Sequence, residues 1–247
     1  MKIALIGYGR MGKEIAAVAR EKNMEVVSID PSGDSDFKEL SPEALEGVDV
    51  AIDFTHPSVA VENIRKVAAQ GVNLVVGTTG WYDRMHEVEQ IVQQRGIGLI
   101  WSGNFSVGVN LFFRVVENAA VLIDALPEYD IAVHEIHHNK KADSPSGTAR
   151  MVGDIILKSM SRKTTVTIET LDRPIRPEEL HVTSERVGTV PGVHIVTIDS
   201  AADTIELKHT ARTRTGFALG AVMAAEFIEG KKGLYSIDDL MNTIVGA

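Results

Sequence analysis

A glycine-rich turn near the N-terminus constrains the fold of this chain more than any other feature. Residues 2–6 form a short apolar run typical of a buried strand, and Gly7-Tyr8-Gly9-Arg10-Met11-Gly12 follows it. Glycines with this spacing, between a strand and a helical pattern, allow a tight turn and let a pyrophosphate approach the backbone. A second strand pattern ends on Asp30, 18 residues past Gly12, close to where a ribose-binding carboxylate belongs. The sequence therefore predicts a dinucleotide-binding unit rather than a merely structural turn.

The first hundred residues alternate apolar runs with helical patterns. The expected strands are 2–6, 24–30, 48–54, 73–77 and 97–101, and the expected helices are about 11–22, 57–70 and 83–95. Such alternation predicts a parallel, doubly wound sheet, in which ligands bind at the carboxyl ends of the strands. Two polar clusters, Gly77-Thr78-Thr79-Gly80 and Ser102-Gly103-Asn104-Phe105, fall at those ends. The polar segment 35–47 is expected to be a loop.

The pattern changes after a long amphipathic helix expected at 107–126. Candidate strands follow at 129–136, 164–170, 181–187, 193–199 and 203–209, with one helix at 148–160 and a helical tail at 216–229 and 236–244. Several of these strands alternate with period two without intervening helices, and a hairpin is expected around residues 201–203, which predicts a mixed or antiparallel sheet. The tail is expected to return to the first domain.

These patterns predict an α/β fold with two domains. An N-terminal dinucleotide-binding domain with a Rossmann-like parallel sheet is expected over residues 1–105. C-terminal helices within 214–247 are expected to complete it. A second α+β domain, residues 106–213, is expected to be built on the mixed or antiparallel sheet.

Chemistry-bearing residues concentrate in one segment of the second domain. His137-His138-Asn139-Lys140-Lys141 gathers histidines and lysines in a chain whose net charge is −9, and a Ser-Pro-Ser-Gly turn leads from it into the helix expected from Thr148. Histidine is suited to proton transfer near neutral pH, and the amides at a helix start bind anions. The segment therefore predicts a site that protonates a substrate carrying carboxylates, whereas a plain charged surface loop is the alternative.

Other histidines and polar residues have simpler interpretations. His134, His137 and His138 resemble a metal-ligand set, but the neighbouring lysines repel a cation and no carboxylate spacing supports it, so no metal is expected. Thr78 and Thr79 could be only a polar strand end, and Arg10 could contact phosphate or face solvent. Structural roles are expected for a further group of residues, namely turn formation by Asp143 and Ser144 and surface or packing positions for His56, His181, His194 and His209.

Bulk properties exclude several classes of protein. The net charge of −9 argues against a general nucleic-acid or membrane binder. The chain has no cysteine and no apolar run of about 18 residues, and no signal peptide is expected. We therefore expect a cytoplasmic enzyme without nucleic-acid or membrane partners.

Five motifs occur in order along nearly the whole chain. They are Gly7-x-Gly9-Arg10-Met11-Gly12, Gly77-Thr78-Thr79-Gly80, Asn104-Phe105-Ser106-x-Gly108-Val109-Asn110, Glu135-x-His137-His138-x-x-Lys141-x-Asp143-Ser144-Pro145-Ser146-Gly147-Thr148-Ala149 and Ala211-x-x-Arg214-x-x-Phe217-Ala218-x-Gly220-Ala221. Together they resemble the 4-hydroxy-tetrahydrodipicolinate reductase (dihydrodipicolinate reductase) family of lysine and diaminopimelate biosynthesis. The fourth motif is specific to that family and the glycine turn is not.

The resemblance implies an oxidoreductase, usually a homotetramer, that reduces a cyclic unsaturated dicarboxylate with NADH or NADPH. It implies that His137 donates a proton and that Lys141 is the second catalytic group, while the second domain binds substrate and forms the oligomer. The substrate-binding residues implied are His138, Lys141, Gly147 and Thr148. The cofactor-binding residues implied are Gly7, Tyr8, Gly9, Arg10, Met11, Gly12, Asp30, Gly77, Thr78, Thr79, Ser102, Gly103, Asn104, Phe105 and Arg214.

Three positions depart from the family pattern. Pro31 follows Asp30 where many relatives have a basic residue, so NADH is the expected cofactor and NADPH use is possible. Lys140 stands where a histidine is common and adds positive charge, and Gly103 replaces an alanine or proline.

Two other functions are alternatives to this one. A sugar or inositol dehydrogenase of similar plan usually has Glu-Lys-Pro after the fifth strand, where this chain has Trp101-Ser102-Gly103-Asn104. A catalytically inactive nucleotide-sensing protein would be expected to lose His137 or Lys141, and both are present.

Overall fold

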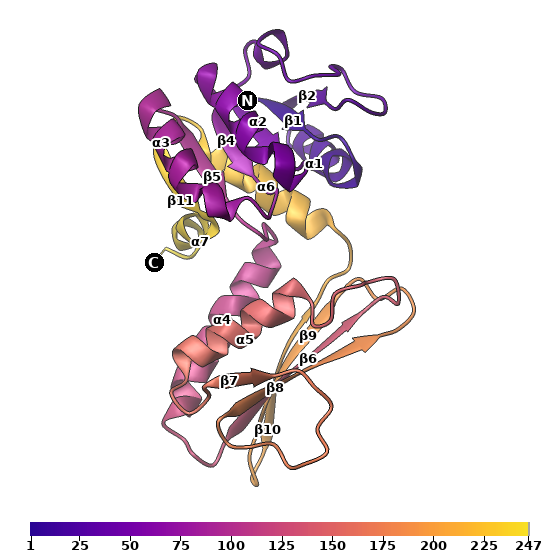
Figure 1. Cartoon of the computed structure of the whole chain (residues 1–247), viewed down its shortest axis with the longest axis vertical. Helices are drawn as coiled ribbons and strands as arrows, with labels where there is room; N and C mark the ends of the chain where they lie inside the picture. Colours follow the sequence, from indigo (N-terminus) through magenta and orange to yellow (C-terminus); the bar gives the residue numbers. More distant parts are fainter. Residues whose placement is uncertain (247) are drawn as a thin grey trace. The chain divides into compact units, whose positions relative to one another are not determined.

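The computed structural model describes residues 1–246, which divide into two compact units (Figure 1). The first contains Met1–Val107 together with the C-terminal segment that begins at Arg214, and the second contains Gly108–Thr213. Among residues 1–246, no helix combines the length and the apolar character needed to cross a membrane.

The first unit is built on a six-stranded parallel sheet with the order β11-β5-β4-β3-β1-β2. Its strands are β1 (Lys2–Ile6), β2 (Glu25–Ile29), β3 (Val50–Asp53), β4 (Asn73–Val76), β5 (Gly98–Trp101) and β11 (Gly233–Ser236). The expected Rossmann-like sheet is confirmed. Strand β11 was not predicted, because four residues at a sheet edge form too short a pattern to indicate a strand.

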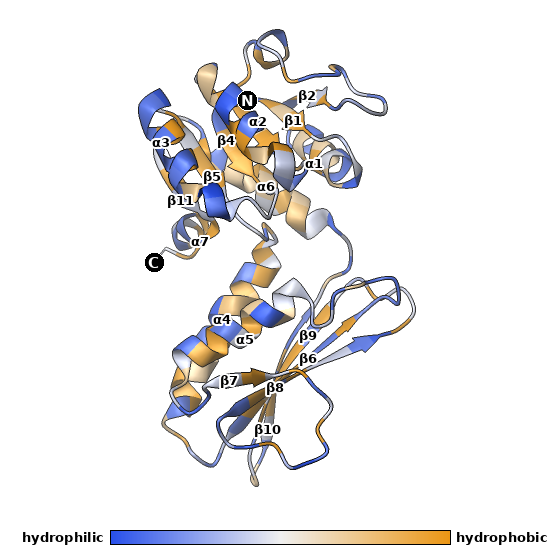
Figure 2. Ribbon diagram, in the orientation of Figure 1, coloured by the Kyte–Doolittle hydropathy of each residue, from blue (hydrophilic) through white to orange (hydrophobic). Residues whose placement is uncertain are grey.

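Helices cover both faces of this sheet. They are α1 (Arg10–Glu21), α2 (Pro57–Ala69), α3 (Met85–Arg95), α6 (Thr215–Ile228) and α7 (Ile237–Val245). Successive residues of a strand point to opposite faces, so Ile3 and Leu5 pack with α1 and α6, whereas Ala4 and Ile6 pack with α2 and α3. The central strands are therefore largely apolar between Asn73 at the start of β4 and Asp53 at the end of β3, while α3 carries polar residues on its outer side (Figure 2).

Two short helical turns lie between these elements. The first, η1 (Glu43–Leu45), lies within segment 35–47, which was expected to be only a loop, and it buries Ala44 and Leu45. The second, η2 (Tyr82–Arg84), precedes α3, so the α-helix starts two residues later than the expected residue 83. The buried apolar residues of η1 are held by tertiary packing rather than predicted by local periodicity, whereas η2 buries no residue.

The second unit combines a five-stranded mixed sheet with two helices. The sheet order is β10-β9-β6-β8-β7, in which β6–β8 and β7–β8 are parallel and β6–β9 and β9–β10 are antiparallel. The elements are α4 (Val107–Asp124), β6 (Asp130–His137), α5 (Gly147–Ser159), β7 (Thr165–Thr167), β8 (Glu179–Arg186), β9 (Val193–Asp199) and β10 (Thr204–Thr210). The expected second sheet and its hairpin are confirmed, although β7 is shorter than predicted.

The buried face of strand β6 is apolar at its start and polar at its end. Its inward face begins with Ile131 and Val133, which pack against α4 and α5. The next two positions on the same face are Glu135 and His137, and both are buried. An apolar face that ends in two buried polar groups is unusual, because each buried polar group must find a partner.

Candidate active site

The register of the second sheet surrounds Glu135 and His137 with polar neighbours. His137 is paired with Arg186 across the parallel strands β6 and β8, and Glu135 is paired with His194 across the antiparallel strands β6 and β9. Directly opposed residues share a face of the sheet. The fold therefore gathers a carboxylate, a guanidinium and two imidazoles from three strands.

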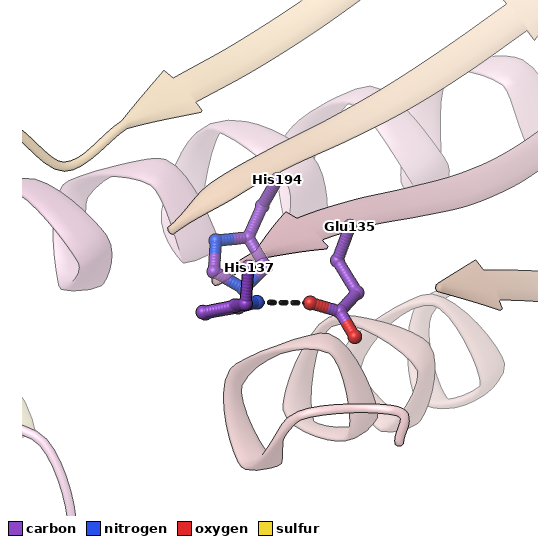
Figure 3. A group of neighbouring side chains, drawn as sticks. All are labelled: Glu135, His137 and His194. Atoms are coloured by element: carbon purple, nitrogen blue, oxygen red, sulfur yellow. Dashed lines mark hydrogen bonds and ion pairs between the residues drawn. The ribbon is translucent and has the colours of Figure 1, made fainter. Parts of the chain in front are cut away.

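The carboxylate of Glu135 is fully buried, and both of its oxygens accept hydrogen bonds. One oxygen, Oε2, is hydrogen-bonded to Nδ1 of His137 (Figure 3). The other, Oε1, accepts from Nη2 of Arg186 at 2.7 Å and from the backbone N–H of Ser146 at 3.2 Å. Burial raises the pKa of Glu135, but the hydrogen bonds from Arg186, Ser184 and His137 hold it below the ordinary value, so the group is a carboxylate at neutral pH.

The two histidines differ in their electrostatic surroundings. Burial lowers the pKa of His137, the charge and hydrogen bond of Glu135 oppose that effect, and Lys141 and Arg186 add to it, leaving the pKa below its ordinary value. Burial, followed by the nearby His137, lowers the pKa of His194 to about 4, so His194 is uncharged at neutral pH. Of the two, His137 is therefore the histidine on whose pKa nearby charges act in opposite directions.

His194 lies beside His137, and His209 lies beside His194, although neither neighbour was predicted from the sequence. The rings of His194 and His137 are 5.3 Å apart between centroids, and Nε2 of His194 is 3.3 Å from Oγ of Ser146. His209 continues the group at 6.4 Å from His194. The expectation of a packing position thus holds for His194, which is buried, but the residue on which it packs is the predicted proton donor.

Gly192 leaves the second nitrogen of His137 uncovered. A Cβ atom built on Gly192 would lie 2.9 Å from Nε2 of His137, closer than such contacts normally come. Nδ1 of the same ring is directed to Glu135, so Nε2 is the nitrogen that remains for another molecule. Any larger residue at position 192 would cover it.

The loop after His137 brings the remaining predicted substrate residues together. Ser146 caps α5 through its side chain, which accepts from the N–H of Ala149 at 3.2 Å. Nζ of Lys141 lies 2.8 Å from Oδ1 of Asp143. The hydrogen bond from Lys141 is the main reason that the pKa of Asp143 is low, and the amide of Gly147 contributes. Lys141 and Gly147, both expected to bind a substrate carboxylate, therefore hold a carboxylate of the chain itself.

Unpartnered polar atoms gather in the same region. Within residues 1–246, four buried side-chain nitrogen atoms lack a hydrogen-bond partner, and all four lie in the second unit: His138 Nδ1, Arg186 Nε, His194 Nδ1 and His209 Nδ1. Buried polar groups normally have partners, so such a concentration is typical of a site that receives a polar ligand.

A metal ion is the other kind of ligand that this cluster could hold. Glu135, His137 and His194 offer atoms that all lie within 4.8 Å of one another. Arg186 already pairs with Glu135, and the charge of Lys141 acts on His137, so positive charge is present where a cation would have to enter. His134, one of the metal ligands considered from the sequence, instead contacts Thr183 through Nδ1 at 2.7 Å. We therefore interpret the cluster as a hydrogen-bonded carboxylate–histidine pair.

The glycine turn of the first unit has the close backbone packing expected of a dinucleotide site. Gly7 has φ +90°, and a Cβ there would lie 2.3 Å from the carbonyl oxygen of Phe54. A Cβ on Gly12 would lie 2.2 Å from the carbonyl oxygen of Gly7, whereas Gly9 faces open space. Gly9 is also the N-cap of α1 and provides no side-chain cap, so the helix start presents backbone N–H groups to a ligand.

Asp30 is tied to this turn. Its Oδ2 accepts from the N–H of Tyr8 at 2.6 Å, and its Oδ1 accepts from the N–H and the hydroxyl of Ser32 at 2.8 and 2.7 Å. Burial raises its pKa, but these hydrogen bonds and the charge of Lys38 bring it below the ordinary value. Asp30 lines a cavity of about 530 Å³ together with Ile6, Gly7, Gly9, Ile29, Pro31, Lys38, Glu39, Leu40, Phe54, Thr55, His56, Val59, Asn63 and Lys66.

Thr78 uses its hydroxyl inside the protein. It donates to Oδ1 of the buried Asp53 at 2.5 Å and accepts from the N–H of Thr55 at 2.7 Å. Burial raises the pKa of Asp53, which ends β3. The carbonyl of Thr78 is also occupied, because it accepts from Nε1 of Trp81 at 2.7 Å, while Thr79 and Gly80 next to it are exposed. Gly77 adjoins the ring of Phe54, which a Cβ would meet at 2.1 Å.

The segment after β5 has a similar division of roles. The hydroxyl of Ser102 donates to the carbonyl of Asn104 at 2.9 Å and accepts from its N–H at 3.0 Å, which shapes the turn. The side chain of Phe105 is 1% exposed and packs in the core of the first unit. Gly103 and Arg214 are exposed, and Arg214 stands at the N-terminus of α6.

Sequence comparison identifies the family. A family model described as "Dihydrodipicolinate reductase, N-terminus" matches residues 1–105, and one described as "Dihydrodipicolinate reductase, C-terminus" matches residues 108–241. Among curated relatives, the 4-hydroxy-tetrahydrodipicolinate reductase of Christiangramia forsetii is 37% identical over 99% of both chains. That of Methanosarcina barkeri is 37% identical over 95% of this chain and 82% of its own.

The fold agrees with this result. A solved dihydrodipicolinate reductase from Paenisporosarcina sp. TG-14, with bound dipicolinate, superimposes with a TM-score of 0.77 at 21% identity and covers 96% of this chain and 97% of its own. Both halves of the sequence match the same family, and the two-sheet architecture matches a solved structure of that name. The chain therefore belongs to the dihydrodipicolinate reductase family.

Proposed function

We propose that the protein reduces 4-hydroxy-tetrahydrodipicolinate to tetrahydrodipicolinate with a pyridine nucleotide, as a step of lysine and diaminopimelate biosynthesis. The observation that carries the proposal is His137, held by a buried carboxylate at the end of β6, beside Lys141 and the start of α5. Family membership over both halves of the chain supports it, as does the reductase name of the curated relatives.

The substrate is a dicarboxylate, and the second unit has groups that suit both carboxylates. Lys141 provides an ammonium, and Gly147 and Thr148 provide amides at the start of α5. His138 has an unpartnered Nδ1 that can bind a polar atom of the ring or a carboxylate. Asp143 must release Lys141 for the substrate to bind in this way.

His137 supplies the proton. The net conversion adds one hydride and one proton and removes the hydroxyl oxygen as water. A bound reduced nicotinamide supplies the hydride. His137 in its protonated form donates from Nε2 to the carbon that gains electron density, while Glu135 holds Nδ1 and Lys141 offsets negative charge that develops on the substrate. General acid assistance of this kind contributes roughly 10²–10⁴ to a rate.

The first unit fits the nucleotide. The Gly7–Gly12 turn would hold the pyrophosphate, and Asp30 would hold the ribose. The exposed backbone at Thr79 and Gly103 would contact the rest of the cofactor, with Arg214 near its nicotinamide end. Asp30 carries a negative charge in this cavity, and Pro31 offers no guanidinium to a 2′-phosphate. We therefore propose NADH as the preferred cofactor. The homotetramer and the cytoplasmic location stay predictions that rest on the family resemblance.

Assays with the nicotinamide cofactor separate this function from the two alternatives. The purified protein is incubated with NADH and freshly generated substrate, and nicotinamide absorbance is followed. His137→Gln should lower turnover by roughly 10²–10³ with little change in NADH affinity. Binding of NADH without turnover would indicate a nucleotide sensor, and oxidation of a sugar or inositol with NAD⁺ would indicate the other dehydrogenase class. A loss below about fivefold in His137→Gln would remove His137 from the proton-donating role.

A further inference from the structure

We propose that Glu135 is a positioning residue that prepares His137 for proton donation: it accepts from Nδ1, leaves Nε2 as the atom that gives up the proton, and balances the positive charge of the protonated ring. The proposal rests on the proposed function for the identity of the proton acceptor only. It assigns a role to a residue that sequence reasoning left without one.

The contacts of Glu135 support this role over a purely structural one. A buried ion pair between Glu135 and Arg186 would be sufficient to join β6 to β8, and it occupies only Oε1. The second oxygen is directed to Nδ1 of His137, two residues along the same strand and on the same face (Figure 3). The N–H of Ser146 at 3.2 Å fixes the carboxylate from a third side, next to the start of α5. A carboxylate held at three points gives the imidazole one orientation.

That orientation exposes the other nitrogen of His137. Because Nδ1–H is donated to Glu135, the proton that a protonated ring can give away is the one on Nε2. Gly192 lies beside Nε2 without covering it, since a Cβ there would come within 2.9 Å. The side chain of His137 is 10% exposed, enough for contact at one atom. Because Nδ1 is paired with Glu135 and Nε2 is left uncovered by Gly192, His137 can donate a proton from Nε2 alone.

Four groups from different elements determine the charge at His137. Glu135 on β6 is negative, Arg186 on β8 and Lys141 in the following loop are positive, and His194 on β9 is uncharged at neutral pH. Removing the negative charge of Glu135 should therefore make His137 easier to deprotonate. Removing the positive charge of Arg186 should make it harder, and these opposite effects are the signature of the proposed role.

The primary test replaces the carboxylate by an amide of the same shape, Glu135→Gln. The matched control is Glu179→Gln, because Glu179 is also buried, accepts from Arg173 at 2.7 Å, and accepts from the backbone N–H of Arg176 at 2.9 Å, away from His137. The titration of His137 is followed by nitrogen-15 NMR of its ring in the protein without substrate, and the pH profile of kcat is measured with substrate and NADH.

In the Glu135→Gln variant, we expect the titration midpoint of His137 to fall by about one pH unit or more. We also expect a smaller fraction of the neutral ring to carry its hydrogen on Nδ1. The high-pH decline of kcat should move in the same direction, with about a tenfold lower kcat at neutral pH. Glu179→Gln should leave both measurements unchanged. A uniform fall in kcat without movement of the titration or the pH profile would show that Glu135 serves only the structure and would overturn the proposal.

A second variant keeps the proposal testable if Glu135→Gln does not fold. Arg186→Gln should move the His137 titration to higher pH, because one of the two nearby cations is lost. An unchanged or lower titration in that variant also overturns the proposal. The NMR measurement needs no turnover, so it decides the role of Glu135 even if the chain reduces a different substrate and the proposed function fails.

Discussion

The carboxylate of Asp143 lies 2.8 Å from the ammonium of Lys141, so the predicted substrate-binding lysine already holds an anion of its own chain. The amide of Gly147 also stabilises this carboxylate. A substrate carboxylate that uses the same two groups must displace Asp143. The loop therefore contains an internal competitor for the dicarboxylate.

We predict that Asp143→Asn strengthens binding of a stable aromatic dicarboxylate such as dipicolinate. Asp143 is more than half exposed, so its ion pair contributes only about 0.2–1 kcal/mol, and the affinity should rise by up to about fivefold. Isothermal titration calorimetry measures the change. Asp154→Asn, an exposed position on α5, removes the same charge from the same unit and is the control. Equal or weaker binding in Asp143→Asn would show that Asp143 helps to form the site.

We predict that dicarboxylate binding is coupled to proton uptake at His137. Burial, Lys141 and Arg186 keep the pKa of His137 below its ordinary value in the protein without ligand. Two bound carboxylates add negative charge and raise that pKa, so between the two values the complex takes up a proton and affinity falls as pH rises. Calorimetry in buffers with different ionisation enthalpies counts the proton. His137→Gln should abolish the uptake, and His86→Gln, exposed on α3, should not; undiminished uptake in His137→Gln would assign it to another group.

We predict that His194 makes the fold less stable in acid. Its pKa is about 4 in the folded protein and about 6.5 when unfolded, so the unfolded chain binds the proton first. The stability that this group provides is present above pH 6.5 and is lost as pH falls from there toward 4, by on the order of 3 kcal/mol in total. Urea unfolding between these pH values tests this. His194→Gln should flatten the dependence, and an unchanged slope would place its cause elsewhere.

The fold was largely readable from the sequence because local patterns and tertiary packing agree. The glycine turn, the apolar runs of β1 and β3 to β5, and the period-two strands of the second sheet each predicted what the structure contains. Strand β11 was not predicted because four edge residues form no periodic pattern. The turn η1 was not predicted because its two apolar residues are buried by tertiary packing. In both cases partners distant in sequence decide the conformation.

The site was only partly readable, for a related reason. Glu135 could have been found, since it lies two residues before His137 and therefore on the same face of a strand. Arg186 and His194 could not, because their places beside His137 and Glu135 follow from strand register, which no local pattern specifies. The inward hydroxyl of Thr78 depends likewise on the buried Asp53 of a neighbouring strand.

We predict that Gly9→Ala weakens NADH binding without harming the fold. Gly9 has φ −73°, which alanine adopts readily, and a Cβ there meets nothing within 4 Å in the protein. Any loss of affinity therefore reports a ligand that lies against this backbone, and we expect at least about tenfold, or 1.4 kcal/mol. Gly12→Ala provides the contrast, because its Cβ would meet the carbonyl of Gly7 at 2.2 Å and should destabilise the protein itself. Unchanged NADH affinity in a folded Gly9→Ala variant would remove the turn from the cofactor site.

We predict that Asp30 makes the protein prefer NADH to NADPH. The carboxylate is ionised, lines the cavity beside the glycine turn, and can accept hydrogen bonds from ribose hydroxyls, whereas a 2′-phosphate would bring like charge against it. Two such charges about 4 Å apart repel by roughly 1–4 kcal/mol before screening by salt. Comparing kcat/KM for the two cofactors tests the preference, and Asp30→Asn should narrow it.

The control for that change is Asp34→Asn, an exposed acid in the same loop. Lys38 also lines the cavity and lies close enough to lower the pKa of Asp30, so it is a cation that could receive a 2′-phosphate. Lys38→Gln should accordingly lower kcat/KM for NADPH more than for NADH. A wild-type preference for NADPH that Lys38→Gln removes would show that the lysine, rather than Asp30, determines which nucleotide the protein uses.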